Sequence, residues 1–334
     1  MLRQPEVLDE ERVPMDQLIL HRKRELRRLQ KWAGGRRVNG HAYLLGPPGT
    51  GKTMLAKQVL QARRDSSTRT VFVNCWEHAD RRDVLFHVAN ELRPTEAFHP
   101  DGDKDTVFQR AILDEDHPDT HRYVILDEAD QLVDGDILYD LHRAPDLSMT
   151  LIANDEDDLF ADVDERVQSR FKIGPRIDLD PYPVDELVAI LDKRAEYGLK
   201  DGIVTRRQLE AIASAADGDA RRAICHLRSA AELAALDSDA REIEDDHLAE
   251  ALPRMEDELR QKTISNLNRH HRAIYEVLVG ADGPLAPKTI HERYGDRVDD
   301  PRSKRTVRKY LRKLEHYRLI KSEGTSSDKT YWPM

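Results

Sequence analysis

An eight-residue segment, Gly46–Thr53, constrains this chain more than any other part of it. It reads GPPGTGKT and fits the pattern G-x-x-x-x-G-K-[ST] of a phosphate-binding loop. The apolar run 41–45 before it predicts a buried strand, and residues 54–60 after it predict a helix. Between a strand and a helix, such a loop points several backbone N–H groups and the positive end of the helix at one anion. The segment therefore predicts a nucleotide site in an α/β domain.

Individual residues of this loop have separate expected roles. Lys52 is expected to reach the outer phosphates, and the hydroxyl of Thr53 to coordinate Mg²⁺. We expect contact with the cofactor from the whole loop, from the two residues after it and from one tyrosine further on: Gly46, Pro47, Pro48, Gly49, Thr50, Gly51, Lys52, Thr53, Met54, Leu55 and Tyr182.

The composition limits the classes of protein to which this chain can belong. The 334 residues suffice for two or three domains, and no apolar run approaches the roughly 18 residues of a membrane span. The two cysteines, Cys75 and Cys225, lie far apart in sequence, which predicts buried thiols rather than a disulfide framework. The net charge is −10, yet residues 263–334 hold 15 Lys and Arg against 9 Asp and Glu, a net of +6. An acidic body with a basic C-terminal part indicates an anionic partner for that part.

Strands and helices alternate over residues 1–180, which predicts a parallel sheet with helices on both faces. A basic amphipathic helix is expected to begin at Leu18, and another helix is expected at 81–93, before the polar stretch 94–121. Residues 181–262 read as an all-α domain and residues 263–334 as a third domain. The expected strands are 41–45, 70–75, 122–128, 149–154 and 176–180, and the expected helices of the second domain are 183–197, 205–216, 219–237 and 244–259.

Polar residues follow the expected strands at one edge of this sheet. Asp127 and Glu128 end an apolar strand, where an NTPase needs one carboxylate for the Mg²⁺ shell and a second for the attacking water. We expect Asp127 in the first role and Glu128 in the second. Asn154 ends the next strand, and its amide is expected to hold the lytic water or to touch the γ-phosphate.

Three arginines complete the candidate catalytic set. Arg221 begins an expected helix of the second domain, from which it would reach the phosphates. Arg166 and Arg170 lie in a short segment from which either one would reach the nucleotide of a neighbouring subunit as an arginine finger.

The C-terminal domain reads as a winged helix-turn-helix, with helices at 264–280, 287–294 and 303–318 and a hairpin over 319–334. In the long helix, Val307, Leu311 and Leu314 recur at core spacing. Cations dominate the other faces, which predicts binding to the phosphates of double-stranded DNA, with two lysines of the hairpin adding contacts. The expected DNA-binding residues are Lys304, Arg305, Arg308, Lys309, Arg312, Lys313, Lys321 and Lys329. The pair His270-His271 lacks ligand spacing, so we expect both residues in a core or on the surface.

Together these motifs resemble those of the AAA+ ATPases, and more narrowly the archaeal replication initiators of the origin-recognition / cell-division-control family. His21-Arg22 resembles the segment that flanks the adenine in that family, 154–160 resembles its "sensor 1" loop and 218–224 its "sensor 2" helix. The resemblance implies ATP or ADP with Mg²⁺, and slow hydrolysis used as a switch. It also implies binding to origin duplex DNA, recruitment of the MCM helicase, and a cytoplasmic, nucleoid-associated protein without a membrane, monomeric or assembling on DNA.

Two departures from the family pattern keep other functions open. The stretch 94–121, where the family carries a second DNA-touching motif, is short and acidic here. Ser169-Arg170 is more similar to the finger motif of clamp loaders, so a clamp-loader-like ATPase is one alternative. A transcription regulator that uses nucleotide only as a ligand is another.

Overall fold

The computed structural model describes residues 1–33, 40–63, 68–92, 121–161, 163–325 and 328–334. The chain forms two compact units, Met1–Glu256 and Asp257–Met334, and each is described by itself.

The first unit is organised around a five-stranded parallel sheet with the order β2-β3-β4-β1-β5. The predicted strands are present, each with its ends shifted by at most two residues. The register places Asn74 of β2 beside Asp127 of β3, so the carboxyl ends of these neighbouring strands meet at one edge of the sheet. The strands are β1 (His41–Leu45), β2 (Thr68–Asn74), β3 (His121–Asp127), β4 (Leu147–Ala153) and β5 (Arg176–Asp178).

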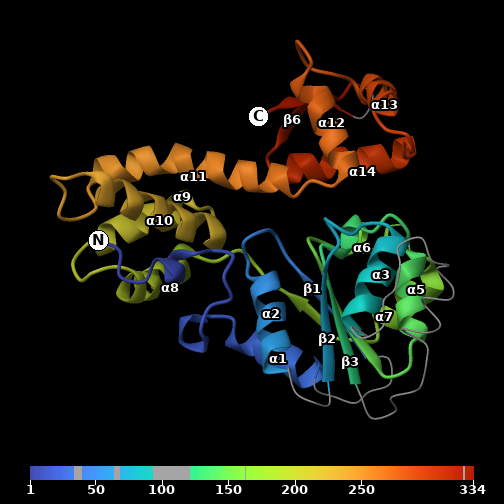
Figure 1. Ribbon diagram of the computed structural model, residues 1–334, viewed down its shortest axis with the longest axis horizontal. Helices are drawn as coiled ribbons and strands as arrows, with labels where there is room; N and C mark the ends of the chain where they lie inside the picture. Colours follow the sequence, from blue (N-terminus) through green and yellow to red (C-terminus); the bar gives the residue numbers. More distant parts are fainter. Residues whose placement is uncertain (34–39, 64–67, 93–120, 162, 326–327) are drawn as a thin grey trace. The chain divides into compact units, whose positions relative to one another are not determined.

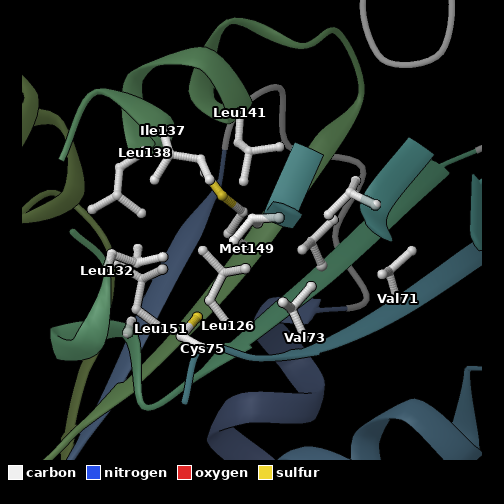
Figure 2. Close-up of a cluster of buried hydrophobic side chains, with 14 of the residues drawn as sticks. Val71, Val73, Cys75, Leu126, Leu132, Ile137, Leu138, Leu141, Met149 and Leu151 are labelled. Atoms are coloured by element: carbon white, nitrogen blue, oxygen red, sulfur yellow. The ribbon is translucent and has the colours of Figure 1, made fainter. Parts of the chain in front are cut away.

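Helices cover both faces of this sheet because the strands are apolar on both sides. Along β3, Tyr123 and Ile125 pack against helices α1 and α2, whereas Val124 and Leu126 pack on the opposite face. Figure 1 shows α1 and α2 on one side of the sheet and α3, α5 and α7 on the other. Figure 2 shows Ile137, Leu138 and Leu141 of α5 over Met149 and Leu151 of β4. These helices and the remaining helices of the domain are α1 (Lys23–Ala33), α2 (Lys52–Ala62), α3 (Arg81–Leu92), the 3-10 helix η4 (Ala129–Gln131), α5 (Asp136–Arg143), α6 (Glu156–Phe160) and α7 (Glu165–Phe171).

The predicted start of the N-terminal helix at Leu18 is wrong, because α1 begins at Lys23. Leu18 instead ends a 3-10 turn, η2 (Asp16–Leu18), and Leu18 and Ile19 are buried. His21 then adopts a φ of 61°, a left-handed conformation that no helix can continue through.

Four helices form a separate apolar cluster after β5. They are α8 (Val184–Gly198), α9 (Arg206–Ala215), α10 (Ala220–Leu236) and the first part of α11 (Asp245–Ser265). Gln208 and Thr205 form a reciprocal capping box at the start of α9. We call the helices α8 to α11 up to Glu256 the lid.

The N-terminal residues pack on the lid, although the sequence indicated the α/β domain for them. Leu2 and Leu199 form an antiparallel bridge, and the N–H groups of Arg3 and Gln4 donate to the carbonyl of Gly198. Leu8, in the 3-10 helix η1 (Pro5–Leu8), is fully buried in the lid core.

The second unit has the element order of a winged helix-turn-helix. Helix α11 runs on into it as far as Ser265, beyond the predicted end at 259, and Asn268 caps the next helix through the N–H groups of His270 and His271. An isolated bridge joins Leu285 to Tyr331, next to the antiparallel hairpin. The elements are α12 (Arg269–Val279), α13 (Pro287–Gly295), α14 (Lys304–His316), β6 (Ile320–Glu323) and β7 (Thr330–Pro333).

The structure also bears on the expectations for the cysteines, the histidine pair, membrane spans and the acidic stretch. Cys75 and Cys225 are free, buried thiols, as predicted. His270 and His271 are buried, and Nδ1 of His270 lies 2.7 Å from the hydroxyl of Tyr294. In the described part of the chain, no helix is long and apolar enough to cross a membrane. The acidic stretch 94–121 lies outside the described residues except for its last one.

Packing of the N-terminal segment predicts a stability effect at Leu8. Leu8→Ala should lower the free energy of unfolding by about 3 kcal/mol, because it removes a fully buried side chain and leaves a cavity. Urea denaturation followed by circular dichroism measures the change. Leu236→Ala, at a position 78% exposed, is the matched control and should change the free energy little. Equal stability of the two variants would contradict the placement of Leu8.

Candidate nucleotide and DNA sites

The phosphate-binding loop lies between the carboxyl end of β1 and the first turn of α2, and it is closely packed at two glycines. Gly46 has a φ of 148°, and a Cβ there would lie 2.2 Å from the carbonyl oxygen of Leu179. Gly49 has a φ of 73°, and its Cβ would lie 1.9 Å from Oδ1 of Asp219. Glycine is therefore required at both positions, by conformation and by space.

Lys52 lies in the first turn of α2 and is 6% exposed. Its ammonium donates to the carbonyl oxygens of Gly46 and Pro47 at 2.6 and 2.8 Å, and to Oδ1 of Asn154 at 3.4 Å. The loop thus holds a buried cation beside the N-terminus of a helix, and both features favour an anion. The side chain of Asn154 lies at the same point, as the sequence indicated.

Thr53 and Asp127 come together from α2 and β3, with Oγ1 of Thr53 donating to Oδ2 of Asp127 at 2.8 Å. Burial first, and the neighbouring Glu128 second, raise the pKa of Asp127 to about 6. A hydroxyl and a carboxylate in contact are hard oxygen donors of the kind that Mg²⁺ takes. These two residues therefore fit the metal that the loop motif implies.

Glu128 follows directly in a left-handed conformation, with a φ of 54°, and its N–H donates to Oδ1 of Asp127 at 3.1 Å. A non-glycine residue with such a φ is uncommon and costs on the order of 1 kcal/mol. The strained conformation turns the chain away from the strand just after Asp127.

Asn74, at the end of the neighbouring strand β2, was not among the residues predicted from the sequence. It lies in register with Asp127, and its side-chain amide donates to Oε1 of Glu77 at 2.8 Å. The only signal in the sequence was its next-to-last position in the predicted strand 70–75, and the order of the strands in the sheet was needed to place it beside the acidic pair.

Arg22 and Tyr182 pack together near the other end of the loop. The Arg22 guanidinium lies 4.1 Å from the centre of the Tyr182 ring and donates to the carbonyl of Asp180 at 2.5 Å. A Cβ added to Gly51 would lie 3.2 Å from the Tyr182 hydroxyl, so this ring borders the loop. Nδ1 of His21 lies 3.6 Å from a carboxylate oxygen of Glu186 in α8. These contacts bring His21, Arg22 and Tyr182 together, as their expected roles require.

The lid contacts the loop through the first residues of α10. The N–H of Ala220 donates to the carbonyl of Gly49 at 3.1 Å, and that of Tyr182 donates to the carbonyl of Gly218 at 3.0 Å. The Asp219 carboxylate caps the helix through the N–H of Arg222 and lies 3.7 Å from the Arg221 guanidinium. Arg221 thus directly follows Ala220, the lid residue that donates to the loop.

Arg166 and Arg170 are exposed on α7. The Arg170 guanidinium lies 5.7 Å from the centre of the Tyr139 ring. Their expected role as an arginine finger toward a second subunit stays a prediction.

Helix α14 of the second unit carries most of the predicted DNA-binding residues. Ser303 caps it by accepting from the N–H of Thr306 at 3.2 Å, and Val307, Tyr310, Leu311 and Leu314 are buried. The cations on the other faces are exposed or half-exposed, apart from Lys313. They are Lys304, Arg305, Arg308, Lys309 and Arg312, which we call the α14 ridge.

Two lysines expected on the DNA surface are engaged by neighbouring side chains. Lys313 is only 5% exposed, and its ammonium lies 5.1 Å from the centre of the Tyr317 ring, so the prediction that it extends the exposed ridge is wrong. The ammonium of Lys329 pairs with a carboxylate oxygen of Glu315 at 3.2 Å. Lys321 is exposed on β6, as expected.

Comparison with known proteins shows the family. A model of the AAA domain matches residues 36–159, and a model of the Cdc6 AAA+ ATPase-type lid domain matches residues 188–252. "ORC1-type DNA replication protein 9" of Halobacterium salinarum is 39% identical over 293 residues, covering 87% of this chain and 81% of that protein. "ORC1-type DNA replication protein 1" of the same organism is 35% identical over 314 residues, covering 92% of this chain and all of that protein. The chain belongs to the ORC1-type DNA replication proteins.

A solved structure supports the same fold for this ORC1-type protein. The Aeropyrum pernix ORC1 protein in complex with DNA is 25% identical, with a TM-score of 0.71 over 99% of this chain and 92% of that one. The resemblance stated from the sequence motifs is thereby confirmed, as is the AAA+ fold with a parallel sheet and a helical lid.

The contact between the lid and the loop predicts the effect of a side chain at position 49. Gly49→Ala should weaken ATP binding by roughly tenfold, because its methyl group would displace Asp219 and the start of α10 from the loop. Isothermal titration with ATP measures the change. Gly202→Ala is the control, since Gly202 has a similar φ of 78° but no atom within 4 Å of an added Cβ. Equal ATP affinities of the two variants would show that the contact plays no part in binding.

Proposed function

We propose that this ORC1-type protein is an ATP-dependent replication initiator that binds origin duplex DNA and helps to recruit or load the MCM helicase. The observation that carries this proposal is the hydrogen bond between Ala220 of the lid and Gly49 of the phosphate loop. A triphosphate in the loop must change the surroundings of this bond, so that the lid responds to the nucleotide. The names of the relatives and the DNA complex of the Aeropyrum pernix protein support duplex DNA as the partner.

In this proposal the loop residues bind and orient the phosphates. Lys52 exchanges its carbonyl partners for phosphate oxygens, and the first N–H groups of α2 donate to the same anion. Thr53 and Asp127 hold Mg²⁺, which neutralises charge on the phosphates when it is bound. His21, Arg22 and Tyr182 contact the adenine nucleoside. Solved relatives of this fold that carry ADP and ADPNP in their names support a nucleotide as the ligand.

Hydrolysis requires that a water molecule be oriented and lose a proton. Glu128 is the proposed base, since it follows Asp127 at the edge of the sheet where the phosphates end. Asn154, next to Lys52, orients the water or the γ-phosphate, and Arg221 stabilises the charge from the lid side. We propose that hydrolysis is slow and acts as a switch of the lid.

DNA binding is assigned to the second unit. The α14 ridge and Lys321 supply cations for phosphates, and α14 is the second helix of a helix-turn-helix, which in such motifs lies in the major groove. If five phosphates are neutralised, the logarithm of the affinity should fall with that of the salt concentration at a slope of about −4.5. The antiparallel hairpin after α14 weighs against the clamp-loader-like alternative, whose members end in a helical collar.

Lys52→Ala tests the nucleotide site. It should abolish measurable ATP binding, because the variant lacks the buried ammonium that faces the phosphate position. Fluorescence titration with a labelled ATP analogue measures it. Lys57→Ala, which removes another lysine of α2, is the control and should bind as the wild type does. Unchanged affinity in the Lys52 variant would refute the assignment.

The DNA surface is tested by reversing two charges of the α14 ridge. Arg308→Glu with Lys309→Glu should weaken duplex binding by at least roughly a hundredfold and leave ATP binding unchanged, since two phosphate contacts become repulsive. Gel-shift titration at a fixed salt concentration measures it. Arg206→Glu with Arg207→Glu makes the same charge change on exposed residues of α9. If both double variants bind duplex equally well, α14 is not the DNA-binding helix.

A further inference from the structure

Helix α14 contains a single acidic residue, Glu315, among its many cations. Both oxygens of this carboxylate are engaged. Oε1 accepts a hydrogen bond from the hydroxyl of Ser322, and Oε2 pairs with the ammonium of Lys329 at 3.2 Å. The side chains of Glu315 and Lys329 are 34% and 29% exposed, so the ion pair is partly shielded from water.

These two partners come from the two sides of the C-terminal hairpin. Ser322 lies on β6, in register with Tyr331 of β7, and Lys329 directly precedes β7. Partial burial is the largest single influence and would lower the pKa of Lys329, but the hydrogen bonds and charges of Glu315 and Tyr331 together outweigh it, and the pKa is raised. One carboxylate therefore links the end of α14 to both halves of the hairpin.

Backbone hydrogen bonds hold the hairpin at its base and also at Tyr331, whose N–H and carbonyl both pair with Leu285 at 2.9 Å. Arg318 has a φ of 56° and turns the chain out of α14, and the N–H of Leu319 donates to the carbonyl of Leu314 at 2.9 Å. The N–H of Met334 donates to the carbonyl of Leu319 at 3.1 Å. Leu285 does not belong to α14, so Glu315 adds a direct side-chain link from α14 itself to the hairpin, at Ser322 and Lys329.

We propose that Glu315 is a positioning residue for duplex binding, which holds the hairpin against α14 so that Lys321 and the α14 ridge reach one phosphate backbone. This inference rests on the proposed DNA-binding function. Side chains alternate along β6, so Lys321 and Glu323 share the exposed face while Ser322 faces Glu315. Lys329 then acts through Glu315 rather than on the DNA.

The sign of the expected effect separates this role from simple electrostatics. An acidic side chain beside DNA repels phosphates, so its neutralisation should strengthen binding if charge were all that mattered. A positioning role has the opposite outcome, because the loss of the link lets the hairpin shift relative to α14 and weakens its phosphate contact.

Glu315→Gln is therefore compared with Glu323→Gln, which removes the same charge from an exposed position of β6. Fluorescence anisotropy with a mixed-sequence duplex, in the presence of ATP and at several salt concentrations, measures affinity and salt dependence. We expect Glu323→Gln to bind as tightly as the wild type or slightly more tightly. Glu315→Gln should bind about tenfold more weakly, with the salt slope reduced in magnitude by about one.

Two further variants keep the test independent of folding defects. Ser322→Ala removes one hydrogen bond without a change of charge and should weaken binding several-fold. Lys329→Met should weaken binding in the wild type but have little further effect in the Glu315→Gln background, because coupled residues are not additive. Thermal unfolding of each variant verifies the fold.

The proposal is overturned if Glu315→Gln binds duplex at least as tightly as Glu323→Gln while Ser322→Ala matches the wild type. Full additivity of the changes at 315 and 329 would also overturn it. Failure of the wild-type protein to bind duplex would instead remove the proposed function itself, so the two failures are distinguishable.

Discussion

Two segments, at Leu179 and at Asp219, approach the phosphate loop closely, and the rest of the first unit depends on this constraint. A side chain at Gly46 would meet the backbone of Leu179 just beyond β5, and one at Gly49 would meet Asp219 at the start of α10. The loop is thus enclosed by the edge of the sheet on one side and by the lid on the other. Neither contact leaves room for a Cβ, so the sheet edge and the lid both require glycine in the loop.

The chemistry follows from how a parallel sheet ends. Parallel strands bring their carboxyl ends to one edge, where ligands of such sheets bind. Here that edge carries the contacts of Thr53 with Asp127 and of Lys52 with Asn154. A hydroxyl, a carboxylate, an amide and an ammonium, contributed by three elements, thereby surround the position expected for a triphosphate. These four residues lie on or directly beside helices and strands, which holds the site on rigid elements.

Local patterns in the sequence were enough to predict the strands of the sheet, the phosphate loop and the buried residues of α14. Strands such as β3 contain an apolar run, residues 123–126 in this case, and Val307, Leu311 and Leu314 have helical spacing, so burial follows from the sequence pattern alone. Contacts between distant segments could not be predicted in this way. Leu8 packs on a helix that begins 176 residues later, at Val184, and no local pattern marks that partner.

Charged side chains were also difficult to place from the sequence. Lys313 and Lys329 looked like two more cations of a basic surface, but Lys313 lies beside Tyr317 and Lys329 pairs with Glu315. A lysine has a long apolar stem, so it can be buried along an aromatic ring or pair with an acid, depending on neighbours that only the fold provides. Charge counts therefore predicted a basic domain correctly and overestimated its exposed cations.

If the nucleotide acts as a switch, as we propose, it should also change how tightly the second unit binds duplex DNA. The most direct measurement is the dissociation constant for duplex with a non-hydrolysable ATP analogue, with ADP and without nucleotide, at one salt concentration. We expect the dissociation constants for duplex measured with the ATP analogue and with ADP to differ by roughly fivefold or more. Because linkage is reciprocal, duplex should change the ratio of the affinities for the two nucleotides by the same factor. Identical constants in all three states would contradict the claim.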